Sequence, residues 1–190
     1  MKIKSSFWLA PIAVALVFTH SYLSLTALCS AALHELGHIF MARICKIELK
    51  ELRLGIFGAS LTPASSLCSY KKEILLCLSG PAVNLLCFAL FLPLCNSSEL
   101  AEFFAVSSLF LGILNLLPIH DLDGGRILKC LLCEKLSYDL ADTICRALSF
   151  LLVTAMWLTS VYLLLRTSAS LSLFVFSTAL FCKIFLHRKN

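Results

Sequence analysis

The chain has 190 residues, of which 59% are hydrophobic and 14% are charged, and its mean hydropathy is +0.92. This composition excludes an ordinary soluble domain, because so few charged residues cannot cover a soluble core. The net charge of +5 comes from scattered basic residues that form no patch interleaved with aromatic side chains, so we expect no nucleic-acid partner. We therefore expect a single membrane-embedded domain, residues 1–190, in a lipid bilayer.

Six apolar segments approach the roughly 20 residues that cross a bilayer as a helix. They are 7–23, 24–42, 74–95, 100–118, 147–165 and 169–186. No small-residue cleavage site follows the basic start, so we expect no cleavable signal peptide. With both termini in the cytoplasm, all 16 Lys and Arg residues except Arg166 lie inside, as the positive-inside rule requires. The predicted location is the cell membrane, with several passes and cytoplasmic termini.

The second apolar segment contains "AALHELGHIFMA", residues 31–42. His34 and His38 are four residues apart, so in a helix they share one face and can bind one metal ion. Glu35 lies beside the first histidine, where it can take a proton from a water activated by the metal. Polar groups in lipid are costly and usually functional, although two core histidines bonded to other helices remain the alternative.

The next segment, "IELKELRLGIF" at 47–57, alternates apolar and polar residues, which predicts strand. An exposed strand edge there could pair with an extended substrate, and a hairpin packed only for shape is the alternative. The predicted fold is thus an all-α integral membrane protein with about six transmembrane helices and a small β-hairpin on the cytoplasmic side.

Two asparagines, Asn84 and Asn115, lie in apolar spans and must find partners. They could contact the substrate or its oxyanion, or they could bond to neighbouring helices. Gly80 and Pro81 are expected to kink or narrow their span so that it approaches the histidines.

The fourth span ends in "NLLPIHDLDGGRIL", residues 115–128. Spans two and four both run inward in the predicted topology, so Asp123 converges with the histidines and can complete a three-ligand zinc site. Pro118 should end the helix, and Gly124 and Gly125 should permit a turn. Alternatively, Asp123 only caps the next helix. The segment 126–146 is expected to form one amphipathic surface helix.

The ten cysteines lie mostly in apolar runs, and Cys130 and Cys133 form an isolated CxxC without a second pair. Free cysteine packs as a small hydrophobic residue, so we interpret these thiols as reduced packing groups.

At this point the sequence resembles the site-2 protease family of intramembrane metalloproteases. The resemblance rests on "HELGH" at 34–38, "SGPAVNLL" at 79–86 and "NLLPIHDLDGGRIL" at 115–128. It implies one Zn2+ ion held by His34, His38 and Asp123, with Glu35 as catalytic base. Asn84 and Asn115 match family asparagines near the active site.

The chain has no PDZ domain between the metal motifs, which resembles the subgroup of the stage IV sporulation protein FB. It stops at "FLHRKN", so we expect no CBS domain either. Where relatives often have two prolines, this chain has His120 and Asp121, which adds a third histidine that could approach the metal. The subgroup resemblance implies cleavage of a membrane-tethered transcription regulator or sigma-factor precursor, with regulatory membrane proteins as further partners.

Two other functions remain open, a membrane metal-ion carrier and a catalytically inactive membrane scaffold. Glu35 argues against both, because a carrier needs no base beside its ligand and an inactive relative usually lacks a ligand or the base.

Overall fold

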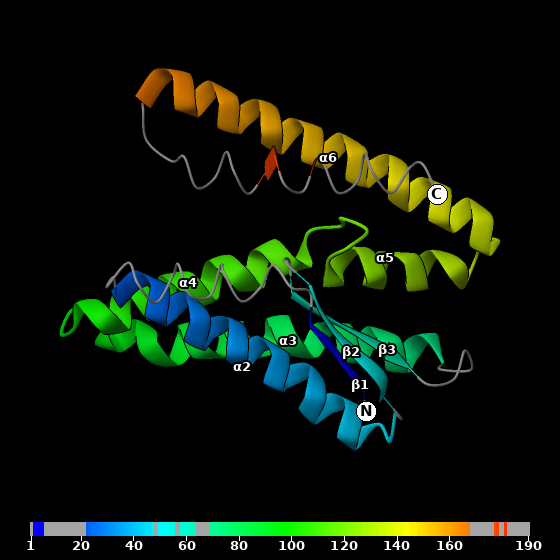
Figure 1. Cartoon of the computed structure of the whole chain (residues 1–190), viewed down its shortest axis with the longest axis horizontal. Helices are drawn as coiled ribbons and strands as arrows, with labels where there is room; N and C mark the ends of the chain where they lie inside the picture. The colour runs from blue at the N-terminus through cyan, green and yellow to red at the C-terminus, as the bar shows by residue number, and fades with distance from the viewer. Residues whose placement is uncertain are drawn as a thin grey trace.

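A computed structural model of the chain describes residues 2–5, 22–47, 49–55, 58–63 and 69–167, together with residues 177, 178 and 181. Figure 1 shows five labelled helices in this part of the chain, with a small sheet beside them. The helices are α2 (Tyr22–Ile44), α3 (Tyr70–Phe91), α4 (Glu99–Leu116), α5 (Asp123–Cys133) and α6 (Tyr138–Thr167). A short 3-10 turn, η1 (Leu92–Leu94), follows α3.

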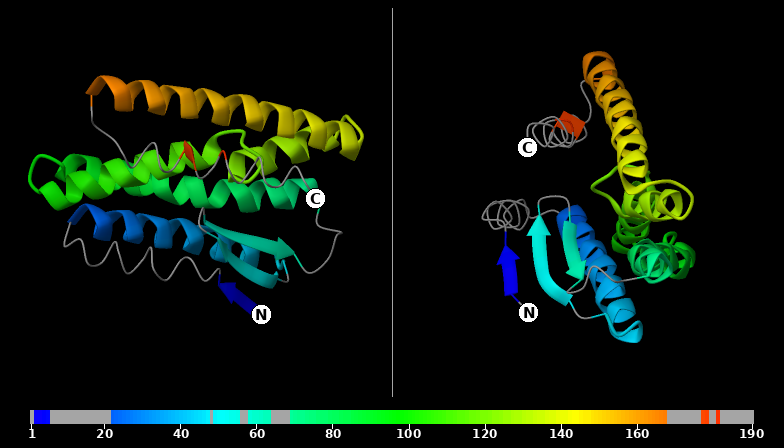
Figure 2. Two further views of the ribbon diagram at one scale, coloured as in Figure 1. Left: turned by 45° about the horizontal axis from the view of Figure 1, so that its top comes forward. Right: turned by 90° about the vertical axis from the view of Figure 1, so that its right-hand side faces the viewer.

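Helices α2, α3 and α4 contact one another in all three pairings, and α5 packs against α3 and α6. Both views in Figure 2, like Figure 1, place α6 on the far side of the α4–α5 layer from α2. Helices α2, α3 and α4 therefore form one packed group in the described structure, and α6 lies along its outside.

Four of the helices are long and apolar enough to cross a membrane. These stretches are Leu25–Ile44, Tyr70–Leu94, Glu99–Leu116 and Tyr138–Arg166. Large apolar side chains such as Phe40, Leu90 and Leu151 point outward, as lipid-facing residues do. The expected spans 7–23 and 169–186 fall almost wholly outside the described residues, so the number six and the orientation of the termini stay predictions.

The sheet has three strands in the order β1-β2-β3: β1 (Lys2–Ser5), β2 (Leu49–Gly55) and β3 (Gly58–Pro63). Strands β2 and β3 run antiparallel, with Gly55 opposite Gly58, and β1 pairs parallel to β2. The prediction of a two-stranded hairpin was incomplete, because β1, near the start of the chain, adds a third strand to the sheet. The cytoplasmic position of the sheet stays a prediction.

One continuous helix over 126–146 is wrong, because a turn at residues 134–137 separates α5 from α6. Ser137 precedes the first turn of α6, where its carbonyl accepts a hydrogen bond from the Ala141 amide at 3.0 Å. Asp139 in the same turn suits the positive end of the helix dipole. Ser137 and Asp139 thus mark the start of a new helix within residues 126–146. Helix α6 continues from there through the apolar span.

The connection from α4 to α5 is short and closely packed. Helix α4 ends at Leu116, two residues before Pro118, and Leu117 is already extended with φ −60° and ψ 139°. A Cβ atom on Gly124 would lie 2.1 Å from the Leu116 carbonyl oxygen, and one on Gly125 would lie 2.0 Å from that of Ile119. The two glycines at the start of α5 thus allow the chain to turn back closely against the end of α4 and the connection.

Candidate metal centre

The first two residues of the site come from one face of α2. His34 and His38 are each 5% exposed, and their ring centroids lie 4.8 Å apart. Their Nε2 atoms are 3.2 Å apart, so both rings present the same nitrogen to the same point. The i, i+4 spacing in a regular helix produces this arrangement, as the sequence predicted.

Asp123 joins them as the first residue of α5. Its Oδ2 atom lies 3.1 Å from His34 Nε2 and 3.2 Å from His38 Nε2. Burial alone would raise the pKa of Asp123, but the hydrogen bonds with the two histidines outweigh it and hold the pKa below its ordinary value. The carboxylate is therefore charged at neutral pH, as a metal ligand must be.

These three residues form a group that could hold a metal ion, with ligand atoms that all lie within 4.8 Å of one another. Two imidazole nitrogens and one carboxylate oxygen match the three protein ligands of hydrolytic zinc sites, which keep a fourth position open. The donor set of the described residues therefore fits zinc.

Glu35 follows His34 in α2 and is partly buried. One of its carboxylate oxygens, Oε2, is buried from solvent. The residue is one position from the candidate ligand His34. A carboxylate in this place lies beside the metal group without belonging to it, since the group contains His34, His38 and Asp123 alone.

Helix α3 closes the site from the other side through two glycines. A Cβ on Gly37 would lie 2.8 Å from the Ser79 carbonyl oxygen, and a Cβ on Gly80 would lie 2.5 Å from His38 Nε2. The close approach expected at Gly80 and Pro81 is confirmed. It allows His38 Nδ1–H to donate to the Leu76 carbonyl at 2.8 Å, which leaves Nε2 free for a metal.

The two asparagines have different surroundings. Asn84, which is fully buried on α3, places its Nδ2 atom 3.2 Å from Nδ1 of His34. Asn115 on α4 instead donates to the Leu111 carbonyl of its own helix at 3.0 Å. Asn84 therefore contacts a candidate ligand directly, and the sequence could not specify this contact. The hydrogen bond that the structure gives Asn115 does not reach a candidate ligand.

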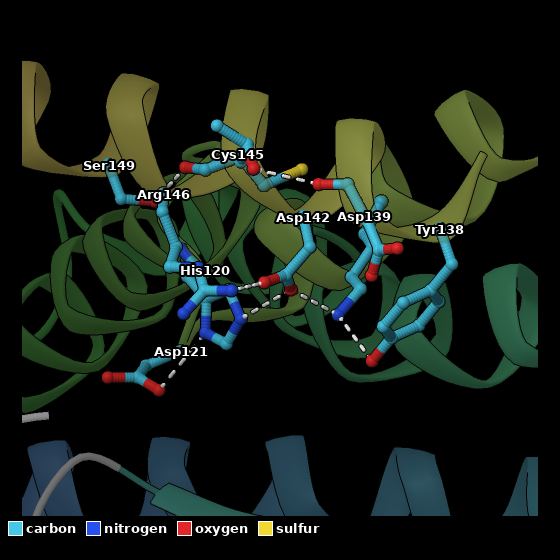
Figure 3. Close-up of polar contacts among 10 residues, drawn as sticks. His120, Asp121, Tyr138, Asp139, Asp142, Cys145, Arg146 and Ser149 are labelled. Atoms are coloured by element: carbon cyan, nitrogen blue, oxygen red, sulfur yellow. Dashed lines mark hydrogen bonds and ion pairs between the residues drawn. The ribbon is translucent and has the colours of Figure 1, made fainter. Parts of the chain in front are cut away.

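His120 and Asp121, which the sequence raised as additions to the site, face another cluster. Figure 3 shows the His120 ring between Asp121 and Asp142, with 3.6 Å from Nδ1 to Asp121 Oδ1 and 3.6 Å from Nε2 to Asp142 Oδ1. The backbone N–H of His120 also donates to Ser149 Oγ on α6 at 2.7 Å. Neither His120 nor Asp121 is in the metal group of the described residues.

Asp142 is the centre of this second cluster and was missed in the sequence. It accepts hydrogen bonds from Lys129 on α5 at 2.5 Å and from Arg146 one turn further along α6. Its side chain is 10% exposed, and its ion pair with Lys129 links α5 to α6. Aspartates inside apolar helices were a usable signal here, but the sequence reading assigned the segment to a surface helix.

A second ion pair joins α5 to α3, because Arg126 donates to Glu73 at 3.2 Å. Cys130 and Cys133, the CxxC cysteines of α5, are both free thiols. Burial raises the pKa of the Cys130 thiol to about 12. A buried neutral thiol is a packing group, which agrees with the sequence interpretation.

Residues 94–158 match the family model described as Peptidase family M50. This segment contains Asp123, whereas His34 and His38 precede it. The match therefore covers the segment of one of the three candidate ligands and not that of the other two.

Two curated relatives carry zinc metalloprotease in their names. Rip3 of Mycobacterium tuberculosis is 30% identical over 118 residues, which cover 57% of this chain and 30% of that protein. Zinc metalloprotease MJ0392 of Methanocaldococcus jannaschii is 31% identical over 117 residues, which cover 57% of this chain and 34% of that protein. The matched region thus spans only about a third of each relative's length.

Among solved structures, the site-2 protease from Methanocaldococcus jannaschii is similar with a TM-score of 0.73 and 21% sequence identity. The alignment covers 97% of this chain and 89% of that chain, so the two share their fold. Part of the chain thus matches peptidase family M50, and the chain shares the fold of that site-2 protease.

Proposed function

We propose that the chain is an intramembrane zinc metalloprotease that hydrolyses peptide bonds in or near transmembrane segments of membrane-associated proteins. The observation that carries this proposal is the convergence of His34, His38 and Asp123 on one point, beside Glu35, within helices apolar enough to span a bilayer. Zinc-dependent proteolysis in the named relatives supports the same chemistry.

In this proposal His34, His38 and Asp123 hold a single Zn2+ ion. When bound, zinc supplies a Lewis acid that makes water nucleophilic near neutral pH. Glu35 takes the proton of the attacking water and passes it to the nitrogen of the leaving amine. The side chains of His34 and Asp123 are only 6% and 12% exposed, and such burial strengthens the local electrostatic interactions.

Substrate binding requires an extended segment, because a helix shields its own peptide bonds. In the three-stranded order, β1 and β3 each have one unpaired edge within the described sheet, and such an edge can pair with an extended chain. We propose Asn115 as a contact to the substrate or its oxyanion, since it is 8% exposed on the helix that leads to Asp123.

The wider biological proposal rests on family analogy. The chain is a multi-pass protein of the cell membrane with cytoplasmic termini, and it resembles the stage IV sporulation protein FB subgroup. Its substrate would be a membrane-tethered transcription regulator or a sigma-factor precursor, and other membrane proteins would control access to the site.

The test replaces Glu35 by Gln in the full chain, which removes the base and leaves the three ligands. We expect the variant to retain about one zinc per chain and to lose cleavage by at least about a hundredfold, the range for a general base. Zinc content of the purified protein and cleavage of co-expressed tethered regulators would be measured together.

Glu102→Gln is the matched control, because Glu102 is an exposed carboxylate in the first turn of α4. It should keep both zinc and cleavage. Retained cleavage in Glu35→Gln would refute the assignment of Glu35 as the base. If that variant still moved zinc across vesicle membranes, the chain would be better described as a metal-ion carrier.

A further inference from the structure

The two candidate histidine ligands differ in the group that faces their second ring nitrogen. His38 Nδ1 faces the Leu76 carbonyl oxygen at 2.8 Å, which can only accept a hydrogen bond. His34 Nδ1 faces the side-chain amide of Asn84 at 3.2 Å, and an amide can either donate or accept. The direction in which the Asn84 amide points therefore favours one tautomer of the His34 ring over the other.

A histidine that binds a metal through Nε2 must carry its proton on Nδ1 and donate it to an acceptor. In the present arrangement the Asn84 NH2 group faces Nδ1, which suits a proton on Nε2 that is donated to Asp123 Oδ2 at 3.1 Å. With its proton on Nε2, His34 cannot offer that nitrogen to a metal.

The opposite direction of the amide would place an acceptor against His34 Nδ1. Asn84 Oδ1 is a buried atom with no hydrogen-bond partner among the described residues. A 180° rotation of the amide exchanges Oδ1 with Nδ2 and turns the unpartnered oxygen into the acceptor for His34 Nδ1–H. Asn84 is fully buried, and α4 approaches it closely at Gly112, where an added Cβ would lie 3.3 Å from Asn84 Cβ.

We propose that Asn84 is the positioning residue of the metal centre, and that its side-chain oxygen accepts the His34 Nδ1 proton and thereby fixes the tautomer that binds zinc through Nε2. This role rests on the proposed zinc site and replaces the substrate or oxyanion contact that the sequence suggested for Asn84. Buried between α2 and α4, Asn84 acts through His34 and not on the substrate.

The test compares zinc affinity in three full-length variants in detergent, by competition with a chelator of known affinity. Asn84→Leu keeps the approximate volume and removes the acceptor, so zinc should bind about 10 to 100 times more weakly, the range measured for such outer partners of metal-binding histidines. Asn84→Asp keeps an acceptor at the same place and should bind zinc at least as tightly as the wild type.

Ser108→Ala is the control, because Ser108 is also a fully buried polar residue of the bundle, on α4, and lies outside the metal group. It should bind zinc as the wild type does. If Asn84 only fills space, zinc affinity would be unchanged in Asn84→Leu, or it would fall equally in Asn84→Leu and Asn84→Asp. Either result overturns the proposal. If Asn84→Leu does not fold, a tenfold loss of affinity in Asn84→Asp is sufficient to overturn it.

Failure of this inference differs from failure of the proposed function. A wild-type chain that binds zinc through Asp123, together with unchanged binding in Asn84→Leu, overturns the Asn84 role alone. A wild-type chain that binds no zinc overturns the proposed metalloprotease and the Asn84 role with it.

Discussion

Two aspartates only two positions apart differ completely in their surroundings. Asp123 is the first residue of α5, and its Oδ2 lies within 3.2 Å of both histidine Nε2 atoms. Asp121 lies in the preceding turn and faces His120. The close packing of Gly124 and Gly125 against the end of α4 fixes which of the two carboxylates reaches the histidines. The pair offers a controlled comparison at single-residue scale.

We predict that Asp123→Asn loses zinc and activity, whereas Asp121→Asn keeps both. Removal of a ligand should weaken zinc binding by more than the about 100-fold that marks the upper range for outer partners. Zinc content and cleavage of the same substrate would be measured for both variants. An inactive, zinc-poor Asp121→Asn beside a normal Asp123→Asn would reverse the ligand assignment.

At the scale of elements, α5 is held by ion pairs at both of its neighbours. Arg126 bonds to Glu73 on α3, and Lys129 bonds to Asp142 on α6. Burial would lower the pKa of Lys129, but Asp142 and the Tyr138 hydroxyl more than offset it and raise the pKa, so the amine is charged at neutral pH. These contacts fix the helix that begins with Asp123, although they lie outside the metal group.

We predict that Asp142→Asn lowers stability by about 1.5 to 3 kcal/mol, the range for hydrogen bonds to charged groups. Both Lys129 and Arg146 lose their shared anion, and Lys129 is only 21% exposed. Asp139→Asn is the control, because Asp139 is an exposed residue in the same helix turn and should cost about 0.3 to 1 kcal/mol through the helix dipole. Thermal unfolding in detergent would compare them, and equal losses would mean that Asp142 is not a special link.

At the scale of the whole molecule, the basic residues predict cytoplasmic termini and an external loop at residues 96–99. We predict that a reporter fused after Asn190 reads as cytoplasmic and that a single cysteine introduced at Ser97 reacts with a membrane-impermeant thiol reagent from outside. Because the chain has ten cysteines, the labelling must be scored against the unmodified chain. An external Asn190 reporter would contradict the six-span topology.

The sequence predicted the metal group because its parts are local patterns. The i, i+4 histidines need only a helix, and the convergence of Asp123 needs only two spans that run the same way. The Asn84 contact could not be predicted, because it depends on the rotation of α3 about its axis and on the glycines that let α3 approach α2. Strand β1 was missed because four residues at a basic start carry little strand signal, and its partner β2 lies about fifty positions away. The break before α6 carried a signal in Ser137 and Asp139 that was read as part of a longer helix.

The separation of the two halves of the metal centre along the chain has a consequence for biosynthesis. His34 and Asp123 are 89 positions apart, and α3 and α4 lie between them. At translation rates of 5–20 residues per second, the ribosome adds Asp123 roughly 5 to 20 s after His34. Throughout that interval the histidine helix and Glu35 exist without the third ligand. The nascent chain therefore cannot complete the proposed metal centre before α5 has been synthesised and has packed against α3.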